Sequence, residues 1–266
     1  MHERERWCVI LDTLAAKRVV TVKELERALD ASAATIRRDL QQLEQQGKLQ
    51  RVHGGAEIAG ERQTKHLIGQ ESFEASRQKH SLEKRAIAER AAALCADGDS
   101  IIIDGGTTTY FMVDPLKERP LHVLTSSFPI AGAFVSAGLA RVLIPGGEVY
   151  REQQVILSPY HDGIVANFYA AKMFMGAQAI TQAGLMQTDP ILIQSERRLI
   201  ERAEQLIVLA DSSKFMRTGG MILCPLDEID VVITDASAPK VALEMLRKAN
   251  VDVIVVPNVL AKARAS

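Results

Sequence analysis

Cysteine is scarce in this sequence, which contains only Cys8, Cys95 and Cys224. An odd number of widely separated cysteines excludes a disulfide framework and a zinc ribbon. We therefore expect three reduced thiols, most of them buried in the core. The six histidines show no spacing typical of metal ligands, so we predict neither a metal site nor a cofactor.

Long apolar runs are also missing. No stretch approaches the roughly 20 consecutive apolar residues that a membrane-spanning helix needs, and we therefore predict no contact with a membrane. The segment Met1–Arg6 is charged where a secretion signal would require an apolar stretch. Together these features predict a cytoplasmic protein.

No charge of one sign dominates the chain, which has 32 Lys and Arg against 33 Asp and Glu and a pI near 6.6. This balance excludes a nucleic-acid binder that is basic over its whole length. With 266 residues, 47% of them hydrophobic, the chain is long enough for one small domain and one larger domain. Any nucleic-acid contact must therefore come from a locally basic segment.

The first fifty residues have the pattern of three helices. Apolar residues form one stripe between residues 3 and 16, and Thr21 with Glu24 gives a capping box at the start of a second helix. Only Asp30 and Ala31 separate the second helix from the third, which favours two helices that meet at a steep angle. The apolar positions of the third helix are Ile36, Leu40 and Leu43.

The third predicted helix has the features of a DNA-recognition helix. Ser32 stands at its N-cap, and Arg37 and Arg38 lie on the face opposite its apolar stripe. Adjacent arginines on an exposed face can bind guanine edges or phosphates. The alternative for such a pair is an ordinary solvated helix face, but here the pair stands within a three-helix pattern.

The segment after this helix, residues 48–56, alternates apolar and polar residues and ends in a glycine pair, which indicates a strand leading into a turn. A basic strand and turn beside a recognition helix form a wing. Between residues 32 and 55 four cations face only Asp39 and Glu44, a local positive excess that suits phosphate contacts. We expect Asp39 to act internally, by orienting a neighbouring arginine or by holding the wing. The predicted DNA contacts are Ser32, Thr35, Arg37, Arg38, Lys48, Arg51 and His53.

Three motifs occur in order: Thr21-Val22-x-Glu24-Leu25, Ser32-x-x-Thr35-Ile36-Arg37-Arg38-Asp39-Leu40 and Arg51-Val52-His53-Gly54-Gly55-Ala56. With these motifs, residues 4–56 resemble the winged helix-turn-helix of the DeoR family of bacterial transcription regulators. The resemblance implies that a domain over residues 1–57 binds double-stranded operator DNA. Since one wing offers a small surface, we expect a homo-oligomer, and the resemblance favours a dimer or tetramer.

Residues 58–74 are polar and lack strong periodicity, and we interpret them as a linker to a second domain over residues 75–266. A helical period runs from Ser81 to Cys95, and short strands follow, most of them apolar on both faces. Such strands, separated by helix-length segments, predict an open α/β fold with a mainly parallel sheet covered by helices. The predicted strands are residues 100–103, 121–124, 141–144, 171–175, 206–210, 231–233 and 253–256.

Ligands of open α/β sheets bind at the carboxyl ends of the strands, and four such ends are rich in Gly, Ser, Thr and Asp. Glycines let a backbone approach an anion, and hydroxyls and helix-opening amides donate to phosphate oxygens. Each loop taken singly is also a normal strand-to-helix turn. As a set they predict a site for a sugar phosphate. A lysine would supply a positive charge for the phosphate, and carboxylates would accept hydrogen bonds from the sugar hydroxyls. The predicted site residues are Asp104, Gly105, Gly106, Thr107, Thr108, Thr109, Ser126, Ser127, Gly146, Gly147, Glu196, Asp211 and Lys214.

The stretch from Gly98 to about Asn258 resembles the sensor domain of the DeoR family, which is similar in fold to ribose-5-phosphate isomerase. The motifs that carry the resemblance include Asp104-Gly105-Gly106-Thr107-Thr108-Thr109 and Asp211-Ser212-Ser213-Lys214-Phe215. The resemblance implies a repressor of a sugar uptake or catabolic operon controlled by a phosphorylated sugar. Both a pentose phosphate and a phosphorylated sugar acid of the ascorbate type fit the sequence.

An aldose-ketose isomerase is the alternative function, because Glu196 stands at the spacing of the proton-abstracting glutamate of such isomerases. The chain departs from the isomerase pattern in two places. Asp189–Gln194 replaces a glycine-rich run, and Met175-Gly176-Ala177-Gln178 replaces an acidic cluster. Enediol chemistry needs a positioned base and polar groups that manage developing charge, so we predict that the protein is not an enzyme.

Overall fold

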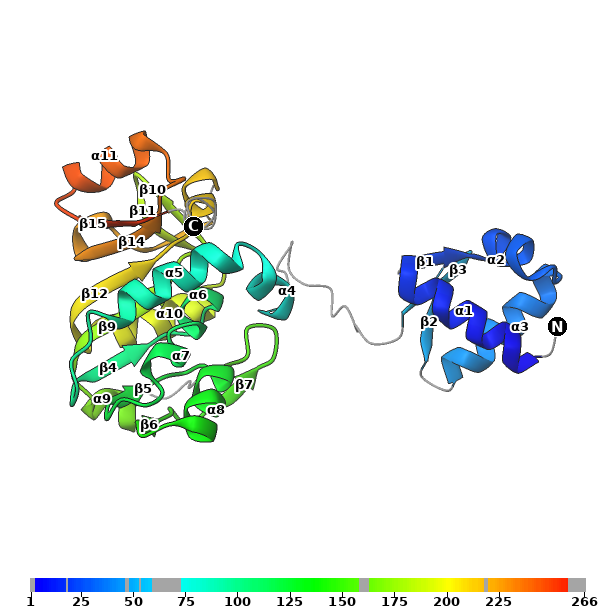
Figure 1. The fold of residues 1–266 in the computed structure, drawn as a ribbon, viewed down its shortest axis with the longest axis horizontal. Helices are drawn as coiled ribbons and strands as arrows, with labels where there is room; N and C mark the ends of the chain where they lie inside the picture. Colours follow the sequence, from blue (N-terminus) through cyan, green and yellow to red (C-terminus); the bar gives the residue numbers. More distant parts are fainter. Residues whose placement is uncertain are drawn as a thin grey trace, which may run out of the picture. The chain divides into compact units, whose positions relative to one another are not determined.

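The computed structural model describes residues 3–17, 19–45, 48–52, 54–58, 73–157, 163–217 and 220–257. The chain forms two compact units, Met1–Gln70 and Glu71–Ser266, and each is described by itself (Figure 1). His53, one of the predicted DNA contacts, and most of the predicted linker lie outside the described residues.

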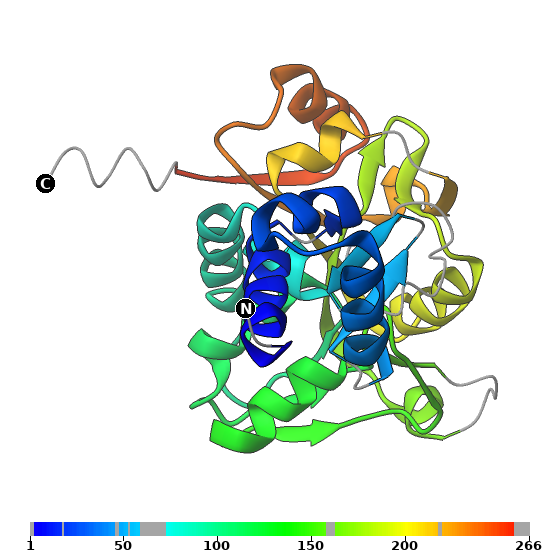
Figure 2. The ribbon, with the colours of Figure 1, turned by 90° about the vertical axis from the view of Figure 1, so that its right-hand side faces the viewer.

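The first unit contains the three predicted helices and a small sheet, and its helices are the blue ribbons of Figure 2. The helices are α1 (Glu3–Lys17), α2 (Val22–Leu29) and α3 (Ala33–Gln45). The strands are β1 (Val19–Thr21), β2 (Leu49–Val52) and β3 (Gly55–Ile58), in the antiparallel order β1-β3-β2. The predicted wing is therefore a hairpin, and β1 completes its sheet.

Local sequence explains where these helices begin and end. Glu24 N–H donates to Thr21 Oγ1 at 3.2 Å and Thr21 N–H donates to Glu24 Oε2 at 2.9 Å, so the predicted capping box is present. Asp30 ends α2 in the left-handed conformation with φ 45°. The apolar stripes of the three helices meet in one core, which includes Ile10, Leu14, Leu25, Ile36, Leu40 and Leu43.

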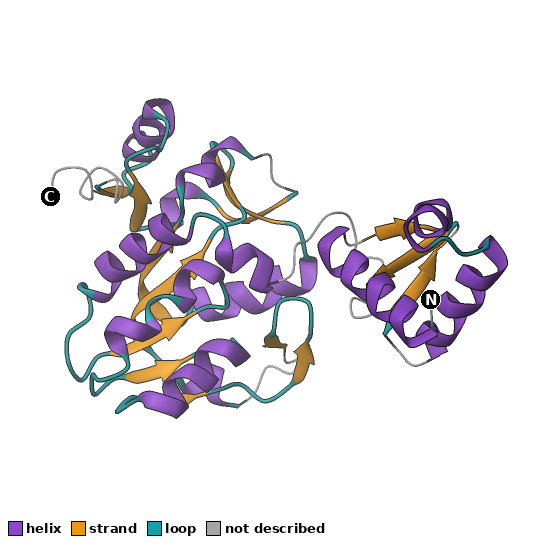
Figure 3. Ribbon diagram, turned by 45° about the vertical axis from the view of Figure 1, so that its right-hand side comes forward, coloured by secondary structure: helices purple, strands orange, loops and turns teal. Residues whose placement is uncertain are grey.

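The second unit is built on a seven-stranded sheet within its described residues, drawn as orange arrows in Figure 3. Each neighbouring pair in the order β15-β14-β12-β9-β4-β5-β6 is parallel. All seven predicted strands belong to this sheet, so the predicted fold class is confirmed. The strands are β4 (Ser100–Ile103), β5 (His122–Leu124), β6 (Arg141–Leu143), β9 (Ala170–Gly176), β12 (Ala203–Leu209), β14 (Val231–Asp235) and β15 (Asp252–Val256).

Both faces of the sheet are covered, because successive residues of one strand enter two different cores. Ile101 and Ile103 pack with α5 and the helices that follow it, whereas Ile102 packs with α10 and α11. The helices of this unit are α4 (Phe73–Gln78), α5 (Ser81–Ala92), α6 (Thr107–Tyr110), α7 (Val113–Leu116), α8 (Phe128–Ala137), α9 (Ile164–Asn167), α10 (Pro190–Ile200) and α11 (Lys240–Lys248), with short 3₁₀ helices η1 (Ser212–Met216) and η2 (Leu226–Glu228).

Two smaller sheets were not predicted from the sequence. A hairpin of β7 (Glu148–Tyr150) and β8 (Val155–Leu157) follows β6, and β10 (Ala179–Thr181), β11 (Gly184–Gln187) and β13 (Met221–Cys224) form an antiparallel sheet. The helix α4 is also unpredicted, and it begins inside the segment interpreted as linker.

The strand order places a topological switch point between β4 and β9, since the chain runs outward from β4 to β6 and then returns to β9 on the other side of β4. Ligands of open α/β sheets bind at such a point. The loops that begin at Asp104 and Ala177 flank it.

Two further expectations concern the cysteines and membrane spans. Cys8, Cys95 and Cys224 are free thiols and the last two are buried, as expected. Burial raises the pKa of the Cys95 and Cys224 thiols to about 11 and about 12. Within the described residues, no helix has both the length and the apolar character to cross a membrane.

Candidate functional sites

The N-terminus of α3 is capped as predicted. Ser32 Oγ accepts a hydrogen bond from Thr35 N–H at 3.3 Å, and the Ser32 carbonyl accepts from Ile36 N–H at 3.0 Å. The two hydroxyls, Ser32 Oγ and Thr35 Oγ1, are themselves 2.9 Å apart. Arg37 and Arg38 are exposed on the same helix, so this face of α3 can meet a partner.

Asp39 has the predicted internal role, but its partners lie on α1. Its carboxylate is 1% exposed and accepts from Arg6 Nε at 2.7 Å, Arg6 Nη2 at 3.0 Å and Trp7 Nε1 at 3.1 Å. The prediction named a neighbouring arginine or the wing, and the sequence separation of more than thirty residues between Arg6 and Asp39 explains why spacing alone could not find the pair. The ion pair fixes α3 against α1.

The wing is tied to the recognition helix by an acidic side chain. Glu44, near the end of α3, accepts a hydrogen bond from Arg51 N–H in β2 at 2.9 Å. Lys48, just before β2, and Arg51, in β2, are exposed. In the turn, Gly54 has φ +87°, a backbone conformation that is strained for residues other than glycine.

In the second unit, the loop after β4 is closed by its own threonine. Thr109 Oγ1 donates to the carbonyl oxygens of Asp104 at 2.8 Å and Gly106 at 2.9 Å, and Thr109 is fully buried. A hydroxyl has one hydrogen to donate. Thr109 therefore shapes this loop, and its hydroxyl has no second hydrogen for a phosphate oxygen.

Gly105 is required by the approach of another strand. A Cβ atom at this position would lie 2.3 Å from Val155 Cγ1 in β8 and 3.6 Å from Ser127 Cβ. The strand β8 is held there because Ile156 N–H donates to the Ser126 carbonyl at 2.7 Å. The hairpin β7-β8 thus lies directly against the loops after β4 and β5.

The other predicted serines and glycines are distributed around this contact. Ser126 and Ser127 are buried, and Ser127 Oγ accepts from Ile130 N–H at 3.4 Å as the N-cap of α8. Gly146 and Gly147 are exposed in the loop that leads from β6 into the hairpin. The far end of the hairpin reaches α10, where Tyr150 Oη donates to Asp189 Oδ2 at 2.7 Å.

A buried lysine that the sequence analysis missed stands beside the predicted phosphate loop. Lys84 on α5 is 2% exposed, and its Nζ donates to Thr107 Oγ1 at 2.9 Å and to the Ser76 carbonyl at 2.5 Å. One signal could have identified it. Lys84 lies three residues before Ile87 and four before Ala88, on the buried stripe of α5. A lysine is rarely buried there unless a polar group binds its ammonium.

Glu196 and Asp104 form a buried acidic pair near the switch point. Gln187 Nε2 donates to both carboxylate oxygens of Glu196, at 3.0 Å and 3.2 Å. Desolvation, and then the charge of Asp104, raise the pKa of Glu196 to about 8, and desolvation also raises the pKa of Asp104. Such carboxyl groups can hold a proton near neutrality and donate a hydrogen bond as well as accept one. Gln187 was not predicted.

Asp211 caps η1 and keeps one oxygen without a hydrogen-bond partner among the described residues. Its Oδ1 accepts from Ser213 N–H at 3.1 Å and from the Ser213 hydroxyl, whereas Oδ2 is buried and unsatisfied. Lys214 follows on η1 and is half-buried. These residues follow β12, which β9 separates from β4.

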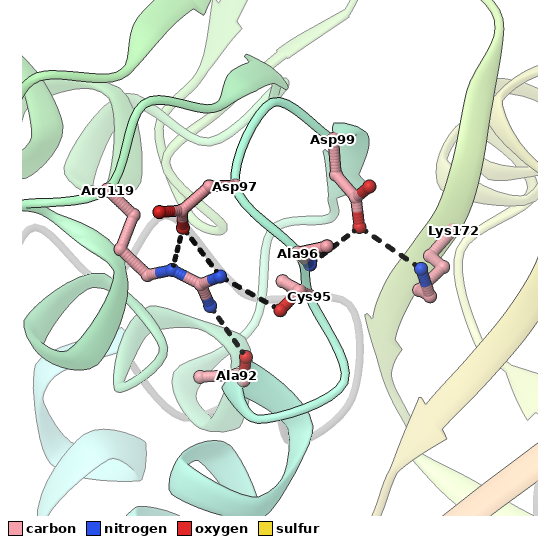
Figure 4. Close-up of polar contacts among 7 residues, drawn as sticks. All are labelled: Ala92, Cys95, Ala96, Asp97, Asp99, Arg119 and Lys172. Carbon is pink, nitrogen blue, oxygen red and sulfur yellow. Dashed lines mark hydrogen bonds and ion pairs between the residues drawn. The ribbon is translucent and has the colours of Figure 1, made fainter.

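A polar cluster at the other end of the sheet has a structural role (Figure 4). Arg119 Nε donates to Asp97 Oδ1 at 2.7 Å, and its Nη1 and Nη2 donate to the carbonyls of Ala92 at 3.3 Å and Cys95 at 3.0 Å. Lys172 Nζ donates to Asp99 Oδ2 at 3.1 Å. Asp97 and Asp99 both precede β4, so the two contacts lie at its amino end, away from the predicted site, and Lys172 belongs to the scaffold.

Two family models match this chain. The DeoR-like helix-turn-helix domain matches residues 6–62, and the DeoR C terminal sensor domain matches residues 79–236, more than half of the chain. The chain belongs to the DeoR family.

Curated DeoR-type relatives resemble the chain over nearly its full length. The HTH-type transcriptional regulators UlaR of Shigella dysenteriae serotype 1 (strain Sd197) and Escherichia coli (strain K12 / DH10B) are each 32% identical over 255 residues. The match covers 96% of this chain and 99% of each relative. The predicted class, a transcription regulator with a DNA-binding domain and a sensor domain, is confirmed, and the isomerase alternative has no support among these relatives.

Solved structures share part of the fold. Ribose 5-phosphate isomerase A from Methanocaldococcus jannaschii is 18% identical with a TM-score of 0.37, covering 50% of this chain and 53% of that chain. The eIF2B beta subunit from Chaetomium thermophilum is 19% identical with a TM-score of 0.41, covering 57% and 48%.

Proposed function

We propose that this DeoR-family protein is a repressor that binds operator DNA through residues 1–57 and is controlled by a phosphorylated sugar bound in residues 75–266. The observation that carries the effector part is the buried Lys84 ammonium beside Thr107 at the switch point. A buried cation needs anionic or polar partners. A phosphate at this loop would supply the strongest of them.

On the DNA side, we assign the operator contacts to Ser32, Thr35, Arg37, Arg38, Lys48, Arg51 and His53. The exposure of Arg37, Arg38, Lys48 and Arg51 supports this assignment. One such surface is small, so the protein would act as a dimer or tetramer on a site with two half-sites. Because operator DNA and sugar phosphates are found in the bacterial cytoplasm, we propose that the protein acts there.

On the effector side, we assign the phosphate to Gly105, Gly106, Thr107 and Thr108, with Lys84 as a cation, and Ser126, Ser127, Gly146, Gly147 and Lys214 around it. The carboxyl groups of Asp104, Glu196 and Asp211 would bind sugar hydroxyls. The unsatisfied Oδ2 of Asp211 supports this role, because a buried acceptor without a partner is costly unless a ligand satisfies it. A pentose phosphate and a phosphorylated sugar acid of the ascorbate type both meet these requirements.

Thermal unfolding of the full chain with ribose 5-phosphate, L-ascorbate 6-phosphate, unphosphorylated ribose or inorganic phosphate tests the proposal. A phosphorylated sugar present at 100 times its Kd should stabilise the protein by about 2.7 kcal/mol. Ribose without phosphate should have no comparable effect. Equal shifts for ribose and ribose 5-phosphate would contradict the assignment of a phosphate site.

A further inference from the structure

The first described element of the second unit, α4, packs on the short helix that follows the predicted phosphate loop. The rings of Phe73 in α4 and Tyr110 in α6 meet edge to face, with centroids 5.9 Å apart and an interplanar angle of 83°. The Arg77 guanidinium lies 5.1 Å from the centre of the Tyr110 ring. Phe73 is buried, so this contact fixes α4 to α6.

Lys84 adds a polar bridge between the same two elements. Its Nζ donates to the Ser76 carbonyl in α4 and to Thr107 Oγ1, the first residue of α6. One buried ammonium therefore has acceptors both in the predicted phosphate loop and in the segment that leads toward the DNA-binding unit. Along the chain, α4 begins three residues after the boundary between the two compact units.

We infer that the contact of α4 with α6, bridged by Lys84, transmits effector binding to the DNA-binding unit. The inference rests on the proposed function, because it takes the phosphate to bind at the Thr107 loop. A hydrogen bond from an ammonium to a phosphate is stronger than one to a carbonyl or a hydroxyl. A phosphate bound at the Thr107 loop would compete with the Ser76 carbonyl for the Lys84 ammonium and so weaken that bond. The site is thereby coupled to the position of α4.

This coupling satisfies the thermodynamic requirement for regulation. An effector changes operator affinity only if it binds two arrangements of the protein unequally. The two arrangements here are α4 docked on α6 with Lys84 bonded to Ser76, and α4 released from that bond. The aromatic contact sets how strongly the first arrangement is favoured.

Hydrogen exchange of the full-length chain measures the release directly. Ribose 5-phosphate, L-ascorbate 6-phosphate and inorganic phosphate are added in turn, and exchange is followed in the peptide that covers α4 and the start of α5. A probe that raises the unfolding temperature should also accelerate exchange in this peptide several-fold. Binding without any change at α4 would overturn the inference alone, whereas no binding by any probe would remove the proposed function and the inference with it.

Variants of α4 separate transmission from binding. Arg77→Gln removes the contact with Tyr110, and Phe73→Ala removes the ring packing, but neither residue belongs to the proposed effector site. The operator is first identified by selecting DNA fragments that bind the wild-type chain. Operator affinity is then measured with and without the phosphorylated compound that binds. The wild-type ratio should lie in the range of roughly 5- to 150-fold. Both variants should bring it close to one while binding the probe at least as tightly as the wild type, because the arrangement that the probe favours is already populated.

Arg90→Gln is the matched control, because Arg90 is an exposed arginine of α5. It should keep the wild-type ratio. If Phe73→Ala fails to fold, Arg77→Gln decides the matter, since Arg77 is only half-buried. Wild-type ratios in a folded Arg77→Gln variant together with unchanged exchange at α4 would reject the inference.

Discussion

Arg6 of α1 and Asp39 of α3 form an ion pair with an Nε to Oδ2 distance of 2.7 Å, in which the Asp39 side chain is 2% exposed. Trp7 adds a hydrogen bond to the same carboxylate. The acid that interrupts the basic recognition helix thus faces the interior of the domain and holds two helices together. The exposed face of α3 keeps Arg37 and Arg38.

The first prediction follows from this pair. Asp39→Asn should lower the stability of the N-terminal unit by about 3 to 5 kcal/mol, because it removes the buried negative charge that accepts from Arg6 and Trp7. Urea unfolding followed by the fluorescence of Trp7, the single tryptophan of the chain, measures the change. Asp12→Asn, at an exposed position of α1, should cost less than about 0.5 kcal/mol. Equal midpoints for the two variants would show that the ion pair does not stabilise the domain.

The second prediction concerns operator binding. Arg37→Ala or Arg38→Ala should weaken operator affinity by about 1 to 3 kcal/mol if the arginine binds a base edge, with effector affinity unchanged. Fluorescence anisotropy at fixed salt measures the affinity. Arg27→Ala, an exposed arginine of α2, serves as control and should have a smaller effect. Wild-type affinity in both α3 variants would remove this helix from the interface.

The third prediction concerns the proposed effector site. Thr107→Val or Lys214→Ala should leave operator affinity intact without effector but should abolish the response to it. In a cell these variants would give a repressor that cannot be induced. The loss of a hydrogen bond to a charged phosphate should weaken effector binding by about 1.5 to 3 kcal/mol. Titration calorimetry with the phosphorylated sugar found by thermal shift measures this loss.

Lys240→Ala is the control for Lys214→Ala, since Lys240 is an exposed lysine at the start of α11. It should respond to effector like the wild type. A full effector response in both Thr107→Val and Lys214→Ala would mean that the effector binds elsewhere.

The fourth prediction uses the raised pKa of Glu196, whose carboxyl is protonated over a wider pH range in the folded state than in the unfolded state. This group contributes no penalty below the ordinary pKa of a glutamate, 4.5. The fold loses stability as pH rises from there to about 8, where the folded-state carboxyl also ionises, and the penalty stays constant at higher pH. Unfolding temperatures between pH 5 and pH 9 should fall more steeply for wild type than for Glu196→Gln. Glu204→Gln, at an exposed position, is the control and should follow the wild-type profile. Parallel profiles would contradict a buried, proton-holding Glu196.

Much of this fold could be predicted because its signals are local. The central strands are short apolar runs, and both faces of Ile101–Ile103 are buried, as the run of isoleucines indicates. By contrast, β7 and β10 contain one large aliphatic residue each, Val149 and Ile180, so neither forms an apolar run. The helix α4 has six residues and only one buried apolar side chain, so it resembles a polar linker.

The candidate site was predictable only where its residues follow strands. The loop at Asp104 and the cap at Asp211 could be found from strand ends, whereas Lys84 and Gln187 reach the site from elements whose packing no spacing rule gives. The partner of Asp39 was missed for the same reason. Side chains that meet across distant segments depend on tertiary packing.

The close approach of Val155 to Gly105 links two segments that lie fifty residues apart. A Cβ atom at residue 105 would force Val155 to shift, so changes at residues 105 and 155 are coupled. Replacement of the loop after β4 in this chain should therefore be accompanied by replacement of the β7-β8 hairpin that lies against it.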